Sequence, residues 1–149
     1  MENKPSKYGA VSELNLKLVV ALHRTIQNDE RSLSARLSEY DLTLSQFGVM
    51  EALYHKGPMK ICEIIEKTLS TSGNMTVVIK NLEKRGYISR DRDDEDRRAF
   101  VIRLKEKGRT IIAEVFPKHL DDLEDEFSNL NIEEKNELLS LLKKMNGVV

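Results

Sequence analysis

Apolar side chains recur every three or four residues along much of this chain, the spacing that places them on one face of an α-helix. The first such stretch, residues 8–40, has the stripe Val11, Leu14, Leu18, Leu22 and Ile26. A single helix of this length extends roughly 45 Å, at about 1.5 Å per residue. Its apolar face is longer than one small domain covers, so we expect a partner chain to share it. An ordinary core helix is the alternative.

Two shorter helices are predicted in the next part of the chain. Thr43 and Gln46 have the spacing of a capping box, which predicts the start of a helix that continues to Tyr54. Gly57-Pro58 ends this helix, because this pair is typical of a turn. A short helix over residues 60–67 follows it.

A third helix in this region begins after Ser70 or Thr71, which are suitable N-cap residues, and ends at Arg85-Gly86. Its apolar stripe consists of Met75, Val78, Ile79 and Leu82. The side chains that face away from the stripe are small, polar or basic, as expected of a helix that lies against base edges and phosphates. With the preceding short helix it predicts a helix-turn-helix pair.

A charged loop between two short strands follows this helix. Residues 87–90 and 99–104 read as strands, and the segment between them, RDRDDEDRR, is too charged to be buried. Residues 80–109 contain eleven basic and seven acidic side chains, although the whole chain has a net charge of −1. A helix followed by a hairpin with arginines near its tip is typical of a winged helix-turn-helix, whose helix enters the major groove and whose wing reaches the minor groove.

This pattern predicts a set of residues that contact DNA. An arginine near the hairpin tip would enter the minor groove, while Arg90 and Arg92 would meet phosphates. The predicted major-groove residues, with the cap before them, are Thr71, Ser72, Asn74, Thr76, Val77 and Lys80.

Two more helical stretches are predicted in residues 106–149. The first has apolar residues from Ile111 to Phe127 and contains Pro117, which predicts a kink or a local break. Asn131 and Glu134 have the spacing of a second capping box and start the last helix.

Composition places the chain among single-domain, helix-rich proteins. It has 149 residues, of which 33% are charged, and a single cysteine, so we expect a reducing, cytoplasmic setting. No signal peptide is evident, and the longest apolar run, Leu18 to Leu22, is too short to span a membrane. Residues 119–137 hold eight acidic side chains and one lysine, so the chain is polarised, with a basic region and an acidic one. Two ordinary solvated faces are the alternative.

The residues that carry chemistry do not form the motif of an enzyme or of a metal site. The three histidines, His23, His55 and His119, have no second ligand at a metal-binding spacing. Cys62 is interpreted as a small, half-buried side chain rather than a redox switch. The acidic run 93–96 lacks the glycine and closing glutamate of a calcium loop. We therefore predict no cofactor, no metal and no enzymatic activity.

Several segments, in order and at these spacings, resemble the MarR family of bacterial transcription regulators. The resemblance is carried by TSGNMT, NLEKRGYI and DRRAFVIRLKEKG in the DNA-binding region, and by DLTLSQFGVMEAL, KGPMKICEI and EVFPKH around it. It implies a mainly α winged helix-turn-helix with a small β-hairpin, in which 41–105 form the DNA-binding lobe and 8–40 and 106–149 the dimerisation helices. The D-x-R of the family's wing falls on Asp96 and Arg98, so the resemblance implies that Arg98 enters the minor groove, oriented by an ion pair with Asp96. Lys60 and Lys105 stand where the family usually has a capping Thr, and both lysines are candidate phosphate contacts.

The resemblance also implies a homodimeric repressor of a pseudo-palindromic operator, released by a small phenolic or oxidant signal. The thiol-sensing members of the family use a cysteine near the start of the first helix, which this chain lacks. The implied effector pocket would involve His23, Phe47, Met50, Tyr54 and Phe116, with a purely structural core as the alternative. A helical protein–protein adaptor that has a winged helix but does not engage DNA is the alternative function.

Overall fold

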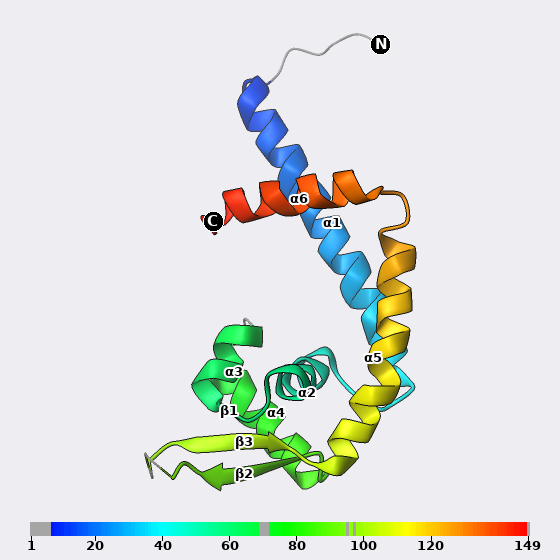
Figure 1. The fold of residues 1–149 in the computed structure, drawn as a ribbon. Coiled ribbons are helices and arrows are strands. Elements are labelled where there is room, and N and C mark those ends of the chain that lie inside the picture. The colour runs from blue at the N-terminus through cyan, green and yellow to red at the C-terminus, as the bar shows by residue number, and fades with distance from the viewer. Residues whose placement is uncertain (1–6, 69–71, 95, 97, 149) are drawn as a thin grey trace.

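The computed structural model describes residues 7–68, 72–94, 96 and 98–148, and within them the chain forms six helices and one three-stranded sheet (Figure 1). The elements, in chain order, are α1 (Ala10–Ser38), α2 (Leu44–Lys56), β1 (Met59–Lys60), α3 (Ile61–Thr68), α4 (Ser72–Lys84), β2 (Ile88–Arg92), β3 (Phe100–Leu104), α5 (Glu106–Glu126) and α6 (Ile132–Met145). The mainly helical winged fold predicted from the sequence is confirmed.

The hydrophobic core lies in a lobe made of α2, α3, α4, the sheet and the start of α5. The sheet is antiparallel with the order β1-β3-β2, and the three helices cover one side of it (Figure 1). Every buried apolar residue that the structure describes falls between Leu37 and Val115. The largest fully buried side chains include Phe47, Met50, Leu53, Ile64, Met75, Ile79, Leu82, Ile88, Ile102 and Ile112.

The rest of α1, the end of α5 and the whole of α6 form an arm that extends away from the lobe (Figure 1). An ion pair joins the two long helices: the Arg36 guanidinium donates two hydrogen bonds to the Asp122 carboxylate, at 2.9 and 2.8 Å. This pair lowers the pKa of Asp122, because the guanidinium stabilises the ionised carboxylate. Helix α6 has no buried residue. None of the helices among the described residues has the length and apolarity needed to cross a membrane.

Both predicted capping boxes are present. Thr43 Oγ1 accepts the Gln46 backbone N–H at 3.2 Å, and Gln46 Oε1 accepts the Thr43 N–H at 3.1 Å. Asn131 and Glu134 make the corresponding two hydrogen bonds at 2.9 Å each. Each box satisfies two backbone donors that a helix start otherwise leaves unpaired, so these starts were predictable from two residues each.

Two predictions for local structure need correction. Strand β1 was not predicted, because two residues are too few to show an alternating pattern; they join the sheet by pairing with Ile102 and Val101. Helix α5 continues through Pro117 without the local break that was one of the expected outcomes.

Two of the glycines inside helices, Gly48 and Gly108, have opposite surroundings. A Cβ on Gly108, in the first turns of α5, would overlap the Tyr87 carbonyl oxygen and lie 2.7 Å from Leu104 Cδ1. Gly108 therefore allows α5 to pack directly on the backbone at the start of the hairpin. A Cβ on Gly48, in α2, would make only an ordinary contact with Thr68 at 3.7 Å.

We predict that alanine at these two positions changes stability in opposite directions. Gly108→Ala should lower the free energy of unfolding by about 1–3 kcal/mol, because the new methyl group overlaps fixed backbone. Gly48→Ala should raise it by about 0.5–1 kcal/mol, because alanine loses less backbone entropy in a helix. Urea denaturation followed by circular dichroism measures both. A Gly108→Ala protein as stable as the parent would contradict the packing described for α5.

Candidate nucleic-acid interface

Helix α4 is anchored by one face and exposed on the other. Met75, Val78, Ile79 and Leu82 are buried in the core, as their spacing predicts. At 100° per residue, Val77, Lys80 and Lys84 lie on the side directly opposite this stripe, and Asn74 and Thr76 lie on its two flanks. All five are exposed. Of the other predicted groove residues, Thr71 lies outside the described residues, and only the backbone of Ser72 is described.

The end of α4 is closed by a Schellman motif at Gly86, which has a φ of +77°. The Tyr87 N–H donates to the Leu82 carbonyl at 3.0 Å, and the Gly86 N–H donates to the Glu83 carbonyl at 2.9 Å. This motif turns the chain directly from α4 into β2, so the orientation of the hairpin follows from that of the helix.

Arg85, the last residue before this turn, is a structural residue although it lies in a basic segment. Its guanidinium donates to the backbone carbonyl of Asp41, pairs with the Asp41 carboxylate at 3.2 Å and donates to the Tyr87 hydroxyl at 3.2 Å. Asp41 itself has a φ of +53°. Arg85 thus ties the end of α4 to the α1–α2 connection and is not a free cation for phosphate.

The hairpin formed by β2 and β3 presents basic side chains around one aromatic ring. Arg92 pairs with Phe100 in the register, and Arg90 is the next residue on the same face. Their guanidinium carbons lie 5.6 and 3.9 Å from the centre of the Phe100 ring. Both arginines are exposed at the surface of the hairpin. Stacking on a ring orients a guanidinium while its N–H groups remain able to meet an anion.

The turn at the hairpin tip is organised by two aspartates. Asp93 Oδ1 accepts the Asp96 backbone N–H at 3.1 Å, and the Ala99 N–H donates to the Asp96 carbonyl at 2.8 Å. Asp96 Oδ1 accepts the backbone N–H of Arg98 at 3.0 Å. The sequence had predicted an ion pair between the Asp96 and Arg98 side chains; in this structure Asp96 instead holds the Arg98 backbone. The Arg98 side chain is exposed.

Lys60 connects this tip to the helix-turn-helix. Its ammonium lies 2.9 Å from Asp93 Oδ2, and this hydrogen bond to the carboxylate raises the pKa of Lys60. Its backbone N–H donates to Glu63 Oε2 at 2.6 Å, at the start of α3. The sequence made Lys60 a candidate phosphate contact. In the structure it pairs with Asp93 at the hairpin tip, because β1 runs beside β3. Lys105 is the N-cap of α5 and makes no side-chain cap hydrogen bond.

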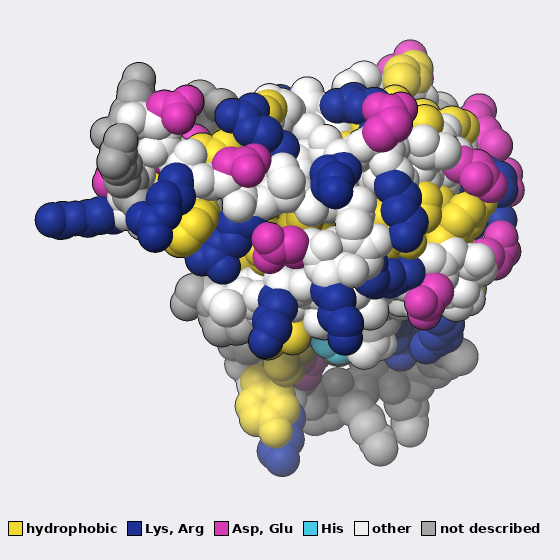
Figure 2. Space-filling model, turned by 90° about the horizontal axis from the view of Figure 1, so that it is seen from below, with side chains coloured by type: hydrophobic (Ala, Val, Ile, Leu, Met, Phe, Trp, Pro, Cys, Tyr) yellow, Lys and Arg dark blue, Asp and Glu magenta, His cyan; other side chains and the backbone are white. Residues whose placement is uncertain are grey.

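Basic side chains gather on the face that carries the hairpin. Figure 2, which views the molecule from below the sheet, shows Lys and Arg side chains from the hairpin tip across the middle of this face, with fewer Asp and Glu among them. The described, exposed basic residues of this region are Lys80, Lys84, Arg90, Arg92, Arg98, Arg103, Lys105, Lys107 and Arg109. Such a concentration attracts a polyanion even though the net charge of the chain is −1.

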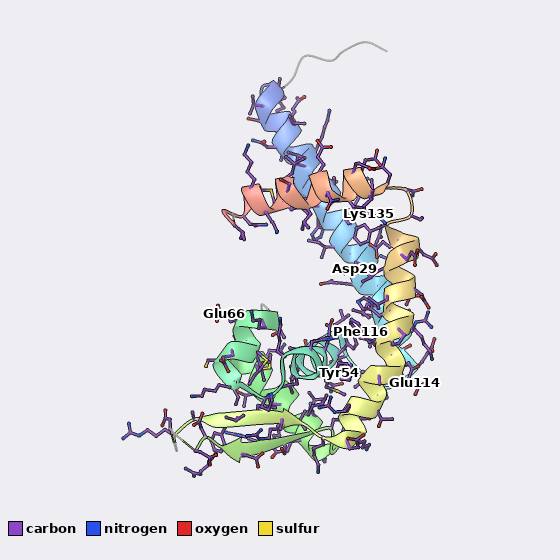
Figure 3. The ribbon with its side chains drawn as sticks, in the orientation of Figure 1. Asp29, Tyr54, Glu66, Glu114, Phe116 and Lys135 are labelled. Atoms are coloured by element: carbon purple, nitrogen blue, oxygen red, sulfur yellow. The ribbon has the colours of Figure 1, made fainter. Side chains whose placement is uncertain are left out.

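The five residues predicted for an effector pocket have different surroundings. Phe47 and Met50 are buried in the core, and His23 is exposed on α1. Tyr54 and Phe116 lie at the junction of α2 and α5 (Figure 3), where both contact the His55 ring, at 5.2 and 4.6 Å between ring centres. Helix α2 turns Phe47 and Met50 toward the core, so its opposite side is the one that faces a cavity.

A cavity of about 590 Å³ does lie on that opposite side. Its lining comes from α1, α2, α3 and α4: Glu30, Leu44, Ser45, Gly48, Glu51, Ala52, His55, Lys56, Lys67, Thr68 and Met75. Sequence reasoning missed these residues because most of them are small or charged, and no pattern separates them from an ordinary solvated surface.

The remaining candidate residues carry no assigned chemistry. Cys62 is exposed rather than half-buried, and it is a free thiol. Among the described residues, no group of three or more His, Cys, Asp or Glu side chains is arranged to hold a metal ion.

Comparison with known proteins identifies the family. The family described as transcriptional regulator SarA/Rot matches residues 31–115. This chain belongs to the MarR/SarA family of winged-helix transcriptional regulators. It is 30% identical to the HTH-type transcriptional regulator MhqR of Bacillus subtilis over 135 residues, which are 91% of this chain and 93% of MhqR. It is 36% identical to the regulator YkoM of the same organism over 106 residues, 71% of this chain and 69% of YkoM.

Solved structures of MarR/SarA-family regulators share this fold. Escherichia coli MarR in complex with operator DNA has a TM-score of 0.81 at 25% identity, covering 92% of this chain and 98% of MarR. Bordetella bronchiseptica BpsR, whose DNA binding is regulated by 6-hydroxynicotinic acid, has a TM-score of 0.79 at 25% identity, covering 87% and 98%. These relatives are transcription regulators and not enzymes, in agreement with the prediction.

We predict that Lys60→Met loosens the hairpin tip. Without the ammonium, Asp93 loses one partner, and the backbone hydrogen bonds beside it open more often. The amide hydrogens of Asp96 and Ala99 should exchange roughly two- to fivefold faster. Lys56→Met, which removes a lysine of α2 that does not pair with the wing, is the control. Equal exchange rates in the parent and Lys60→Met would show that this ion pair does not position the tip.

Proposed function

We propose that this regulator binds a pseudo-palindromic operator as a homodimer and represses transcription from it. The observation that carries the proposal is that a helix with an exposed, largely polar side is followed directly by a basic hairpin. The turn at Gly86 joins the end of α4 to the first strand of this hairpin. A helix of about this length fits the major groove, and a basic hairpin tip fits the minor groove beside it.

Each residue has a proposed role. Asn74, Thr76 and Val77, with Ser72 before them, face the base edges, and Lys80 contacts a phosphate at the border of the groove. Arg90 and Arg92 meet phosphates from the face of the hairpin, and Arg98 enters the minor groove. Asp96 supports Arg98 through the hydrogen bond to its backbone N–H.

The arm provides the proposed dimer surface. Outside the lobe, large apolar side chains of α1 and α6 are exposed; they include Val11, Leu14, Leu16, Leu18, Val19, Val20, Ile26, Ile132, Leu138, Leu139, Leu141 and Met145. Large apolar side chains exposed in such number on two helices are typical of a surface that a protein partner covers. A second copy of the chain covers it with the same residues, since a two-fold interface is self-complementary.

We further propose that a small aromatic effector regulates DNA binding from the cavity between α1, α2, α3 and α4. Its volume is in the range of small-molecule sites, and its wall combines apolar groups with Lys56, Lys67 and His55. It contacts both the arm and the helix-turn-helix pair, so a bound ligand favours one arrangement of the two. The effect of 6-hydroxynicotinic acid on BpsR, a relative with the same fold, supports this class of ligand.

Arg98→Ala should weaken operator binding by about 1–3 kcal/mol while leaving the fold intact. An exposed side chain at a hairpin tip contributes little to folding, so the loss is expected in DNA affinity alone. A gel-shift titration against the DNA upstream of the protein's own gene measures it, and thermal denaturation is the control for folding. Unchanged affinity would remove the wing from the mechanism. A parent protein that binds no DNA would favour the adaptor function.

Leu18→Glu should convert the dimer into a monomer. The substitution places a charge in the centre of the apolar face of α1, which we expect to weaken dimerisation by about 2 kcal/mol or more, roughly 30-fold. Thr110→Glu adds the same charge at an exposed position in the first turns of α5, outside the proposed dimer surface, and is the control. Sedimentation velocity separates the two species. If Leu18→Glu and the parent have the same mass in solution, the dimer surface lies elsewhere.

A further inference from the structure

Val77 is an exposed apolar side chain in a part of the molecule that otherwise buries its apolar side chains. With 57% of its surface accessible, it is the only large hydrophobic residue exposed between Ile26 and Leu120, among the residues whose side chains the structure describes. The other exposed large hydrophobic residues lie on or beside α1, at Leu120 in α5, and on or beside α6. The proposed dimer surface therefore does not account for Val77.

The position of Val77 on α4 gives it a defined direction. It lies about 150° around the helix from the centre of the buried stripe, so its methyl groups point away from the core. Of the four residues one turn away, Asn74, Lys80 and Asn81 are polar or charged and exposed. The fourth is Gly73, which has no side chain. Val77 is an isolated apolar group on a polar helix face.

Neither helix formation nor a protein partner explains this placement well. Valine is a weak helix former, because its branched side chain loses rotational freedom against the preceding turn. A protein-docking surface needs a contiguous apolar patch of several hundred Å², and the polar neighbours of Val77 interrupt any such patch. A single apolar side chain surrounded by hydrogen-bonding ones, such as Val77, is suited to a partner that has one apolar group among hydrogen-bonding groups.

The major groove of DNA contains one apolar feature of this kind, the 5-methyl group of thymine. All other recognition groups on the base edges there are hydrogen-bond donors or acceptors. We propose that Val77 is a specificity-determining residue that selects thymine at one position of each half-site by packing against its methyl group. This inference rests on the proposed function, since it requires α4 to lie in the major groove.

The test removes the thymine methyl group from the DNA and the methyl groups of Val77 from the protein in separate experiments. Operator sites are first selected from a random DNA pool with the full-length parent protein. Each thymine of the selected site is then replaced in turn by deoxyuridine, which differs only in lacking the 5-methyl group. Affinity is measured for the parent protein, for Val77→Ala and for Val77→Thr, which has nearly the same shape and keeps one methyl group.

We expect one thymine in each half-site at which deoxyuridine weakens binding by the parent about fourfold, the effect of burying one methyl-sized group. Val77→Ala should bind the thymine site more weakly and no longer distinguish thymine from deoxyuridine at that position. Val77→Thr should retain an intermediate preference. Deoxyuridine at thymines outside the half-sites is the control on the DNA, and thermal denaturation shows that the variants are folded.

The outcomes distinguish a failure of the proposed function from a failure of the role of Val77. If the random pool gives no enriched site, α4 does not read DNA and the proposed function fails with this inference. If a site is enriched but no thymine methyl affects binding, or its effect is the same with Val77→Ala, only the role of Val77 is overturned. Normal binding by Val77→Ala at every site would instead direct attention to a protein partner on α4, and this too overturns the inference.

Discussion

The burial of one face of α4 is the constraint on which the rest of the lobe depends. Met75, Ile79 and Leu82 are each 2% exposed or less, and they pack with residues of α2 and of the sheet. Because these side chains fix the rotation of the helix about its axis, they also decide which residues face outward. A polar or enlarged side chain in this stripe would change the direction of Val77 and Lys80 even if the helix remained folded. The packing of the core thus determines which side chains of α4 are exposed.

The sequence predicted the elements whose signals are local. Capping boxes at Thr43 and Asn131 and the glycine stop at Gly86 depend on residues within one or two turns, and the structure contains all three. Strand β3 was predicted to within one residue, because Phe100, Ile102 and Leu104 share one face of a short strand. Strand β2 begins one residue later than predicted and continues two residues further, to Arg92. Local physical chemistry was enough for these parts.

Contacts between residues far apart along the chain could not be predicted from the sequence. Lys60 and Asp93 are far apart along the chain and meet only because a two-residue strand joins the sheet next to β3. The cavity could not be predicted for the same reason, because its residues come from four helices whose packing determines which side chains face one another. The resemblance to the family assigned Phe47 and Met50 to a pocket, and the structure buries both in the core, where their aromatic or apolar character is equally suited.

The junction between hairpin and arm joins the hairpin directly to α5. The Lys105 N–H donates to the Tyr87 carbonyl at 2.9 Å, Lys107 Nζ donates to the Arg85 carbonyl at 2.9 Å, and Gly108 lets α5 approach that same backbone. The other end of α5 is fixed to α1 by Arg36 and Asp122. In the proposed dimer, a change in the angle of the arms therefore changes the separation of the two α4 helices, because no flexible linker lies between arm and hairpin to absorb it. A ligand that binds one arm angle better than another needs to supply only the free-energy difference between the two corresponding separations of the α4 helices. Because the half-sites of the DNA are a fixed distance apart, one separation allows binding and the other does not.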